Sequence, residues 1–278
     1  MESSMPWTEI TRRQHDRKGL RYASDTTDAE WRWIAAHLPS ASRRGRPRTV
    51  DLREVVHAVL YILATSCQWR ALPKCFPPFT TVQYYFYRWR DDGTLARINH
   101  VLVMEAREAC GREASPTAGI IDSQSVKTTE SGGPCGYDAG KKVKGRKRHI
   151  VTDTEGFLIG LIVHKANLQD RDGAPFVLKS ILRSHPWLRH IFADAGYAGQ
   201  KLRGALDKIG RFVIDIVRRN PETKGFEVLS RRWVVERTFA WFGRNRRLAK
   251  DFEKSIRSAE TWIFLASIRF LSRRLARA

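Results

Sequence analysis

The chain has 278 residues, 42% of them hydrophobic, with a formal net charge of +21 at pH 7 and a pI of about 10.4. Such a charge predicts a polyanionic partner, DNA or RNA, and not a membrane, since the sequence has no basic amphipathic anchor, lipidation motif or bilayer-spanning apolar run. The 4 cysteines form no CxxC pair and no signal peptide opens the chain, so we expect a cytoplasmic protein with free thiols.

The sequence pattern at residues 25–112 predicts a small helical region, which follows a basic leader at residues 1–24. Thr27 and Glu30 form a capping box that opens a helix, and Pro39 ends it. Apolar residues at helical spacing predict further helices at 51–66, 81–90 and 95–110. We interpret this region as DNA-binding, with a helix-turn-helix as one arrangement that fits.

After Pro116 the pattern changes to strands and helices. Strands are expected at 119–122, 148–152, 157–163, 189–194 and 212–217, and helices at 172–182, 197–209, 229–248 and 260–275. The second and third strands read as a hairpin, whereas residues 127–142 read as a mobile loop. This order predicts an α/β fold for residues 113–278, a mixed sheet with helices on its faces, as in an RNase H-like catalytic core.

Three acidic residues after Pro116 lie in sequence contexts that suit a functional carboxylate. Asp122 and Asp194 end apolar strand segments, and Glu236 lies on a helix rich in arginine. Each one alone is more often a turn, cap or surface-pair residue. Because ligands gather at the carboxyl ends of strands in an open α/β sheet, the set predicts a shared site whose carboxylates hold two Mg²⁺ ions.

The segments around the acids carry a resemblance to a known family. They read IDSQSVK at 121–127, GRKRHI at 145–150, FADAGY at 192–197 and RWVVERTFAW at 232–241, with QWRALP at 68–73 and FPP at 76–78 in the helical region. Together these resemble the DDE transposases of bacterial insertion sequences, most closely the IS5 family within the IS4-type superfamily. In the wider superfamily's motif around the last acid, Arg232 fills the arginine position, whereas Leu229 and Gly243 stand at the tyrosine and lysine positions.

The resemblance implies a transposase that binds terminal inverted repeats, cleaves the element's ends and transfers the 3′-OH ends to target DNA. It implies an RNase H-like core that uses Mg²⁺, with Mn²⁺ as a substitute. The resemblance implies catalytic and metal-binding roles for Asp122, Asp194 and Glu236. The implied partners are double-stranded DNA and at least one further copy of the chain.

Basic residues beside the acids are expected to contact phosphates, although solvated charge is the usual alternative. They are Lys141, Lys142, Lys144, Arg146, Lys147 and Arg148 in one segment, and Arg232, Arg237, Arg244 and Arg247 on and after the Glu236 helix. Arg44, Arg46 and Arg48, in the sequence RGRPR, form either a minor-groove hook or a solvated linker.

Three other functions remain open. An RNase H-like nuclease would cut without joining, and strand transfer of a pre-cut end separates it from a transposase. A domesticated DNA-binding protein would have lost an acid, and the sequence retains all three. An inactive copy of a transposase would keep its acids by chance.

Overall fold

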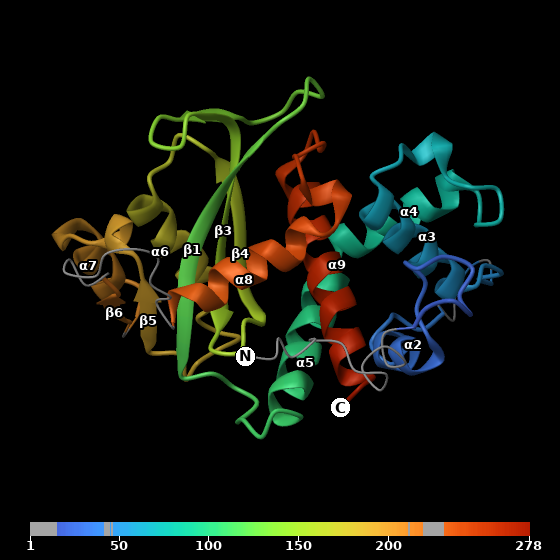
Figure 1. Ribbon diagram of the computed structural model, residues 1–278, viewed down its shortest axis with the longest axis horizontal. Helices are drawn as coiled ribbons and strands as arrows, with labels where there is room; N and C mark the ends of the chain where they lie inside the picture. Colours follow the sequence, from blue (N-terminus) through green and yellow to red (C-terminus); the bar gives the residue numbers. More distant parts are fainter. Residues whose placement is uncertain (1–15, 42–44, 46, 211, 219–230) are drawn as a thin grey trace, which may run out of the picture.

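The computed structural model describes residues 16–41, 45, 47–210, 212–218 and 231–278 (Figure 1). Most of the basic leader, together with Arg44, Arg46 and Leu229, lies outside the described residues. Helices dominate one end of the molecule and the sheet dominates the other (Figure 1). The predicted mixed α/β fold is therefore confirmed in its coarse form.

The helical region has the helices that the sequence predicts, each within a few residues of its expected ends. They are α2 (Asp28–Ala35), α3 (Leu52–Thr65), α4 (Phe79–Asp91) and α5 (Thr94–Glu108). The capping box is formed, because the Thr27 side chain accepts from the backbone N–H of Glu30 while the Glu30 carboxylate accepts from that of Thr27. Asp51 caps α3 by accepting from the N–H of Arg53 at 2.8 Å.

Six strands form one mixed sheet. They are β1 (Ala118–Lys127), β2 (Gly136–Asp138), β3 (Val143–Asp153), β4 (Leu158–Lys165), β5 (His190–Ala193) and β6 (Val213–Ile216). β1 lies in the centre, antiparallel to β3 on one side and parallel to β5 on the other, and β6 extends the sheet in parallel beyond β5. β2 and β4 pair with successive stretches of the second edge of β3.

Several predicted boundaries are wrong. β1 continues five residues past Asp122, because its pairing with β3 extends beyond the point where its pairing with β5 stops. β3 begins at Val143 instead of residue 148, and β2 lies inside the stretch predicted as a loop. The helix predicted at 229–248 is α8 (Arg232–Gly243) followed by a short 3-10 helix, η3 (Arg246–Leu248).

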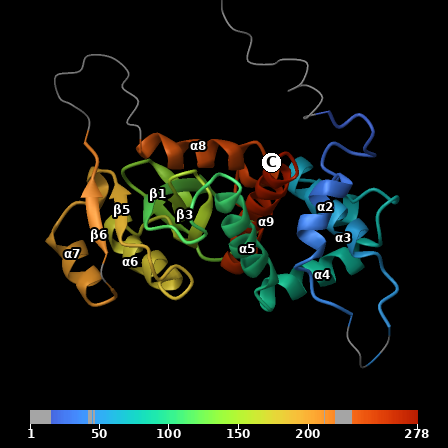
Figure 2. The ribbon, with the colours of Figure 1, turned by 90° about the horizontal axis from the view of Figure 1, so that it is seen from below.

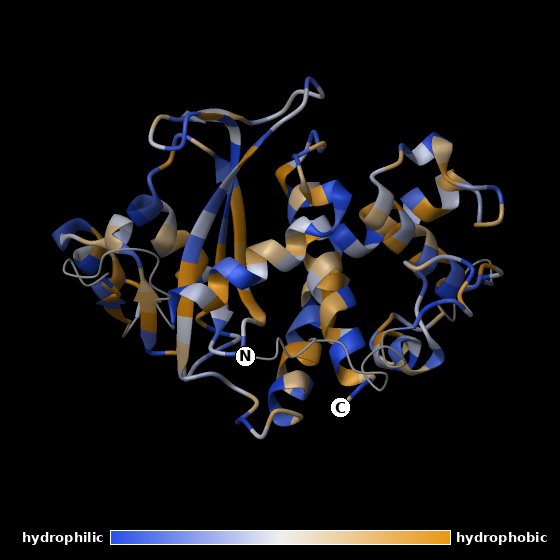
Figure 3. Ribbon diagram, viewed as in Figure 1, coloured by the Kyte–Doolittle hydropathy of each residue, from blue (hydrophilic) through white to orange (hydrophobic). Residues whose placement is uncertain are grey.

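Helices cover both faces of the sheet. α8 contacts β1 and β3 from one face, whereas α6 (Asp170–Ile181) contacts the same strands from the other, with α7 (Gln200–Asp207) beside it (Figure 2). β1 changes along its length from hydrophobic to hydrophilic residues, and Asp122 lies at this change (Figure 3). The sheet thus carries an apolar core at one end and polar side chains at the other.

The last helix, α9 (Ile256–Leu275), packs against α2, α3, α4 and α5 as well as β4. Its Trp262 is almost fully buried, with ring centroids 4.6 Å from Phe86 and 5.9 Å from Trp69. The N-terminal helical region and the end of the chain therefore share one hydrophobic core. Within the described part of the chain, no helix has the length and apolarity needed to cross a membrane.

Candidate active site

Two of the three acids stand level on neighbouring parallel strands. The pairing of β1 with β5 runs from Ala118 opposite His190 to Ile120 opposite Phe192, and the same register places Asp122 opposite Asp194 two residues further on. Asp194 directly follows β5, and its Oδ1 caps the 3-10 helix η2 (Ala195–Tyr197) by accepting from the N–H of Gly196 at 2.8 Å. The parallel strands thus bring these carboxylates together as the sequence predicts.

The surroundings of Asp122 oppose its ionisation. Burial, together with the neighbouring Asp194 carboxylate, raises the pKa of its carboxyl to about 6, although the N–H of Ser123 and the charges of Lys141 and Arg232 lower it. Its Oδ1 accepts a hydrogen bond from the N–H of Ser123 at 2.7 Å. A half-buried carboxylate with so few donors among the described residues has acceptor capacity left for a cation.

An arginine bridges the third acid, Glu236, to Asp194. Glu236 lies on α8 one helical turn after Arg232, whose Nη2 is 3.5 Å from Glu236 Oε1 and 3.8 Å from Asp194 Oδ2. The guanidinium thus supplies positive charge between the two carboxylates. The Glu236 side chain is 54% exposed. No three His, Cys, Asp or Glu side chains among the described residues are gathered closely enough to chelate a metal ion.

A fourth acid, Asp170, belongs to the same site, although the sequence pattern does not predict it there. Asp170, at the start of α6, accepts from Ser123 Oγ at 2.8 Å and from Lys147 Nζ at 2.7 Å. A Cβ at Gly196 would lie 3.0 Å from Asp194 Oδ1 and 3.9 Å from Asp170 Oδ2, so both acids face this glycine. The sequence shows Asp170 only as an acid in the first turn of a helix, a common position for structural reasons.

A buried tyrosine and a buried histidine lie close to the aspartates. The hydroxyl of Tyr197 lies 2.7 Å from His149 Nε2, and both side chains are almost fully buried. Burial lowers the pKa of His149 to about 3, with the nearby His164 adding to this effect. The imidazole is therefore neutral at physiological pH, and its contact with Tyr197 gives His149 a structural role.

Three basic residues expected to contact phosphates are buried instead. Arg146 is 0% exposed and its Nη1 donates to Asp251 Oδ2 at 3.0 Å, while Lys147 and Arg148 are each 4% exposed. Lys147 donates to Asp170, and Arg148 donates to the carbonyl of Leu248 at 2.7 Å. This burial is incompatible with the expected phosphate contacts, because β3 is an inner strand with both faces covered.

Other basic side chains remain at the surface. Exposed residues are Arg48, Lys141, Lys142, Lys144 and Arg244. Lys141 Nζ also donates to the carbonyl oxygen of Ser123 at 2.9 Å, which holds it beside Asp122. Arg237 is held between the rings of Trp233 and Trp241, and Arg247 pairs with Glu253, so protein contacts already engage both.

Comparison with known families agrees with this geometry. Residues 113–271 match the family described as "Transposase DDE domain", and residues 26–99 match "Putative transposase of IS4/5 family". The chain therefore belongs to the DDE transposases. Its N-terminal match places it with those of the IS4/IS5 type.

Individual relatives cover part of the chain. "Putative transposase for insertion sequence element IS402" from Burkholderia cepacia is 37% identical over 117 residues, which make up 40% of this chain and 54% of that protein. "Uncharacterized protein y4sN" from Sinorhizobium fredii is 28% identical over 79 residues, 28% of this chain and 63% of that protein. The matches thus span between half and two thirds of the length of these relatives. No solved structure matches the chain.

Proposed function

We propose that the protein binds the terminal inverted repeats of an insertion sequence, cleaves the phosphodiester at each end and transfers the 3′-OH ends to target DNA. The observation that carries this proposal is the level placement of Asp122 and Asp194 on parallel strands, with Glu236 linked to them through Arg232. The strand order, three antiparallel strands continued by two parallel ones, supports an RNase H-like core.

The donor set suits a hard divalent cation. Asp122, Asp194 and Glu236 offer carboxylate oxygens, the ligands that Mg²⁺ prefers, and Mn²⁺ would substitute for it. When bound, the ions would supply an activated oxygen nucleophile and charge stabilisation for the leaving oxygen. For Glu236 to join the aspartates, Arg232 must turn away from its carboxylate, and a DNA phosphate is a suitable alternative partner for the guanidinium.

The chain's own cations would hold the DNA strand. Lys141 and Arg232 lie beside the acids and would orient the phosphate to be cut. Lys142, Lys144 and Arg244 are exposed and would contact the backbone further along the strand. Such contacts make binding steeply salt-dependent, since each neutralised phosphate releases counterions.

The helical region at 25–112 would recognise the inverted repeats, with the core at 113–278 performing the chemistry. Pairing two element ends in one complex requires at least two copies of the chain. We propose a homodimer or larger assembly on DNA in the bacterial cytoplasm. Loss of residues before Asp51 should weaken end recognition more than metal binding.

Cleavage of a duplex bearing an end of the element, followed by transfer of a pre-cut end, tests this function. Wild-type protein should do both with Mg²⁺, and Asp194→Asn should abolish both while leaving DNA binding nearly intact. Asp91→Asn, at an exposed aspartate paired with Arg90, is the matched control and should remain active. Cleavage without joining would identify a nuclease, and undiminished cleavage by Asp194→Asn would refute the site.

A further inference from the structure

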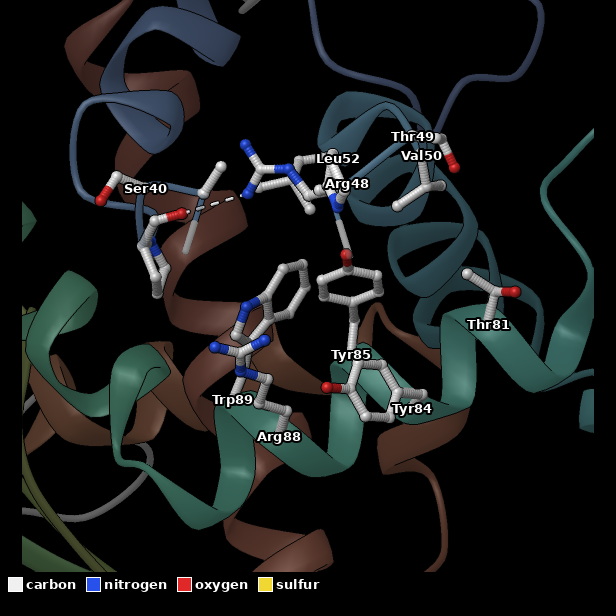
Figure 4. Close-up of a pocket in the computed structure, with 13 residues that line it drawn as sticks. Ser40, Arg48, Thr49, Val50, Leu52, Thr81, Tyr84, Tyr85, Arg88 and Trp89 are labelled. Carbon is white, nitrogen blue, oxygen red and sulfur yellow. Dashed lines mark hydrogen bonds between the residues drawn. The ribbon is translucent and has the colours of Figure 1, made fainter. Parts of the chain in front are cut away.

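A groove lies in the N-terminal helical region, between α4 and the segment that connects α2 to α3 (Figure 4). Its volume is about 430 Å³, and Arg48, Thr81, Tyr84, Tyr85, Arg88 and Trp89 are among its lining residues. The strands β1 and β5, which position Asp122 and Asp194, lie at the other end of the molecule from α3 and α4 (Figure 1). This groove is therefore separate from the candidate active site.

Aromatic rings form one side of the groove. The ring of Tyr85 lies 5.3 Å from that of Tyr84 and 5.6 Å from that of Trp89, measured between centroids. Trp89 is buried, whereas Tyr84 is 57% exposed and leaves much of its ring open to solvent. An exposed aromatic ring beside a cavity offers a surface on which a planar group can stack.

Two arginines and no acids are among the described residues that line the groove, so the charge that these residues carry is positive. Within the described residues, Arg48 makes one hydrogen bond, from Nη1 to the carbonyl of Pro39 at 3.2 Å, and its other donors have no partner there. Arg88 is exposed, and its side chain has no hydrogen-bond or ion-pair partner within the described part of the chain. The guanidinium groups of Arg48 and Arg88 lie near the ring of Trp89, on one side of the Tyr84 and Tyr85 rings (Figure 4).

Unused hydroxyl groups complete the lining. Thr81, Tyr84 and Tyr85 have no side-chain hydrogen-bond partner among the described residues. A concave site with an aromatic surface, a few convergent polar groups and excess positive charge suits a ligand with a planar ring and an anionic group. A nucleotide has both features.

We propose that this groove binds an unpaired nucleotide of single-stranded DNA, with its base on Tyr84 and Tyr85 and its phosphate between Arg48 and Arg88. Its volume is within the range of small-ligand sites, so it admits one nucleotide and excludes a double helix. The inference rests on the proposed function, because strand cleavage and joining expose unpaired nucleotides at DNA ends. Binding itself needs neither metal nor catalysis.

The test is the binding of a fluorescent twelve-nucleotide oligo-dT, measured by anisotropy in EDTA. Tyr84→Ala should weaken binding roughly 10-fold or more, as expected for loss of one stacking contact. Arg88→Gln should weaken it less and reduce the slope of log affinity against log salt by about 0.7. Phe176→Ala, which removes a similarly exposed ring on α6, is the matched control and should bind as wild type does.

A duplex of the same length separates the groove from general DNA binding. Tyr84→Ala should change duplex affinity less than about twofold, since duplex binding depends on backbone contacts elsewhere. Equal losses for duplex and oligo-dT, or oligo-dT binding unchanged in both Tyr84→Ala and Arg88→Gln, would overturn the proposal. Photocrosslinking of 5-iodouracil in the oligonucleotide should label a peptide from α4, and labelling confined to other peptides would also overturn it.

Failure of the proposed function would look different. If the protein never cleaves DNA but its oligo-dT binding depends on Tyr84, the nucleotide groove is supported and only the proposed transposase function is refuted.

Discussion

Two aspartates on neighbouring strands of the sheet, the buried Asp153 and the half-buried Asp122, have opposite surroundings. Asp153 ends β3 at the hairpin turn, where its carboxylate pairs with Arg107 and accepts from the N–H of Phe157 at 2.7 Å and of Glu155 at 3.0 Å. Asp122 lies on the neighbouring strand, and within the described residues it accepts from a single backbone donor. Burial raises the pKa of both carboxyls, and at Asp153 the N–H of Phe157 and the contact with Arg107 offset part of that effect.

The difference separates a structural acid from a functional one. The surroundings of Asp153 are complete without a ligand, which is what a residue that stabilises the fold requires. The surroundings of Asp122 leave oxygen lone pairs unused beside a second carboxylate, which favours a bound cation. Substitution should therefore weaken the fold at Asp153 and strengthen it at Asp122.

The largest effect is expected for Asp153→Asn. It leaves the Arg107 guanidinium buried without a counter-ion, so the free energy of unfolding at pH 7 should fall by about 3–5 kcal/mol. Urea denaturation followed by circular dichroism measures this. Asp91→Asn, at an exposed pair, should change stability by less than about 1 kcal/mol. If the Asp153 variant and wild type are equally stable, the structural role of Asp153, and with it the contrast with Asp122, is contradicted.

Asp122→Asn should stabilise the metal-free protein in a pH-dependent way. The folded-state pKa of about 6 exceeds the ordinary value of 3.8, so the folded protein binds this proton more tightly than the unfolded chain does. Wild-type stability is therefore full below about pH 4 and declines as pH rises through 6. Above pH 7 the variant should be more stable by up to about 3 kcal/mol in EDTA.

At pH 4 the two proteins should unfold at the same urea concentration. A variant that is less stable than wild type at pH 8 would show that Asp122 holds the fold together, as Asp153 does. That result would weaken the assignment of Asp122 to a cation site.

Asp170→Asn should have an intermediate effect. Loss of its charge weakens the hydrogen bond from Lys147, a charge-assisted contact, and should lower stability by about 2 kcal/mol at pH 7. Burial raises the pKa of Asp170, but hydrogen bonds from Lys147 and Ser123 outweigh it and leave the pKa lowered. The deficit should therefore shrink as pH falls below the ordinary value, and a constant deficit in thermal melts across pH 3–7 would contradict this.

Arg232→Gln should have the smallest effect on stability. Its contacts with Asp194 and Glu236 are 3.8 and 3.5 Å long and partly exposed, so the change should be below about 1 kcal/mol. DNA cleavage should fall nevertheless if the guanidinium orients a phosphate. A large loss of stability with normal cleavage would assign Arg232 a structural role.

Much of this contrast could be predicted from local sequence. The capping box at Thr27, the helices of the N-terminal region and the hairpin of β3 and β4 follow from residue type and spacing. The proximity of Asp122 to Asp194 also follows, because each acid comes after an apolar strand segment. Local pattern therefore predicts the elements and the principal acids.

Contacts between distant segments could not be predicted in the same way. Asp170 joins the site only because α6 begins beside β1 and β3, and the burial of Lys147 depends on both faces of β3 being covered. A run of basic residues looks the same in sequence whether it lies in an inner strand or on the surface. Only the sheet order distinguishes the two.

The most direct test of the central claim is a titration of metal-free protein with Mn²⁺, followed by electron paramagnetic resonance of the free ion. Wild type and Asp91→Asn should bind Mn²⁺, whereas Asp122→Asn and Asp194→Asn should bind at least about 10-fold more weakly. Mn²⁺ binding by Asp122→Asn that equals wild type would contradict a metal site at these acids.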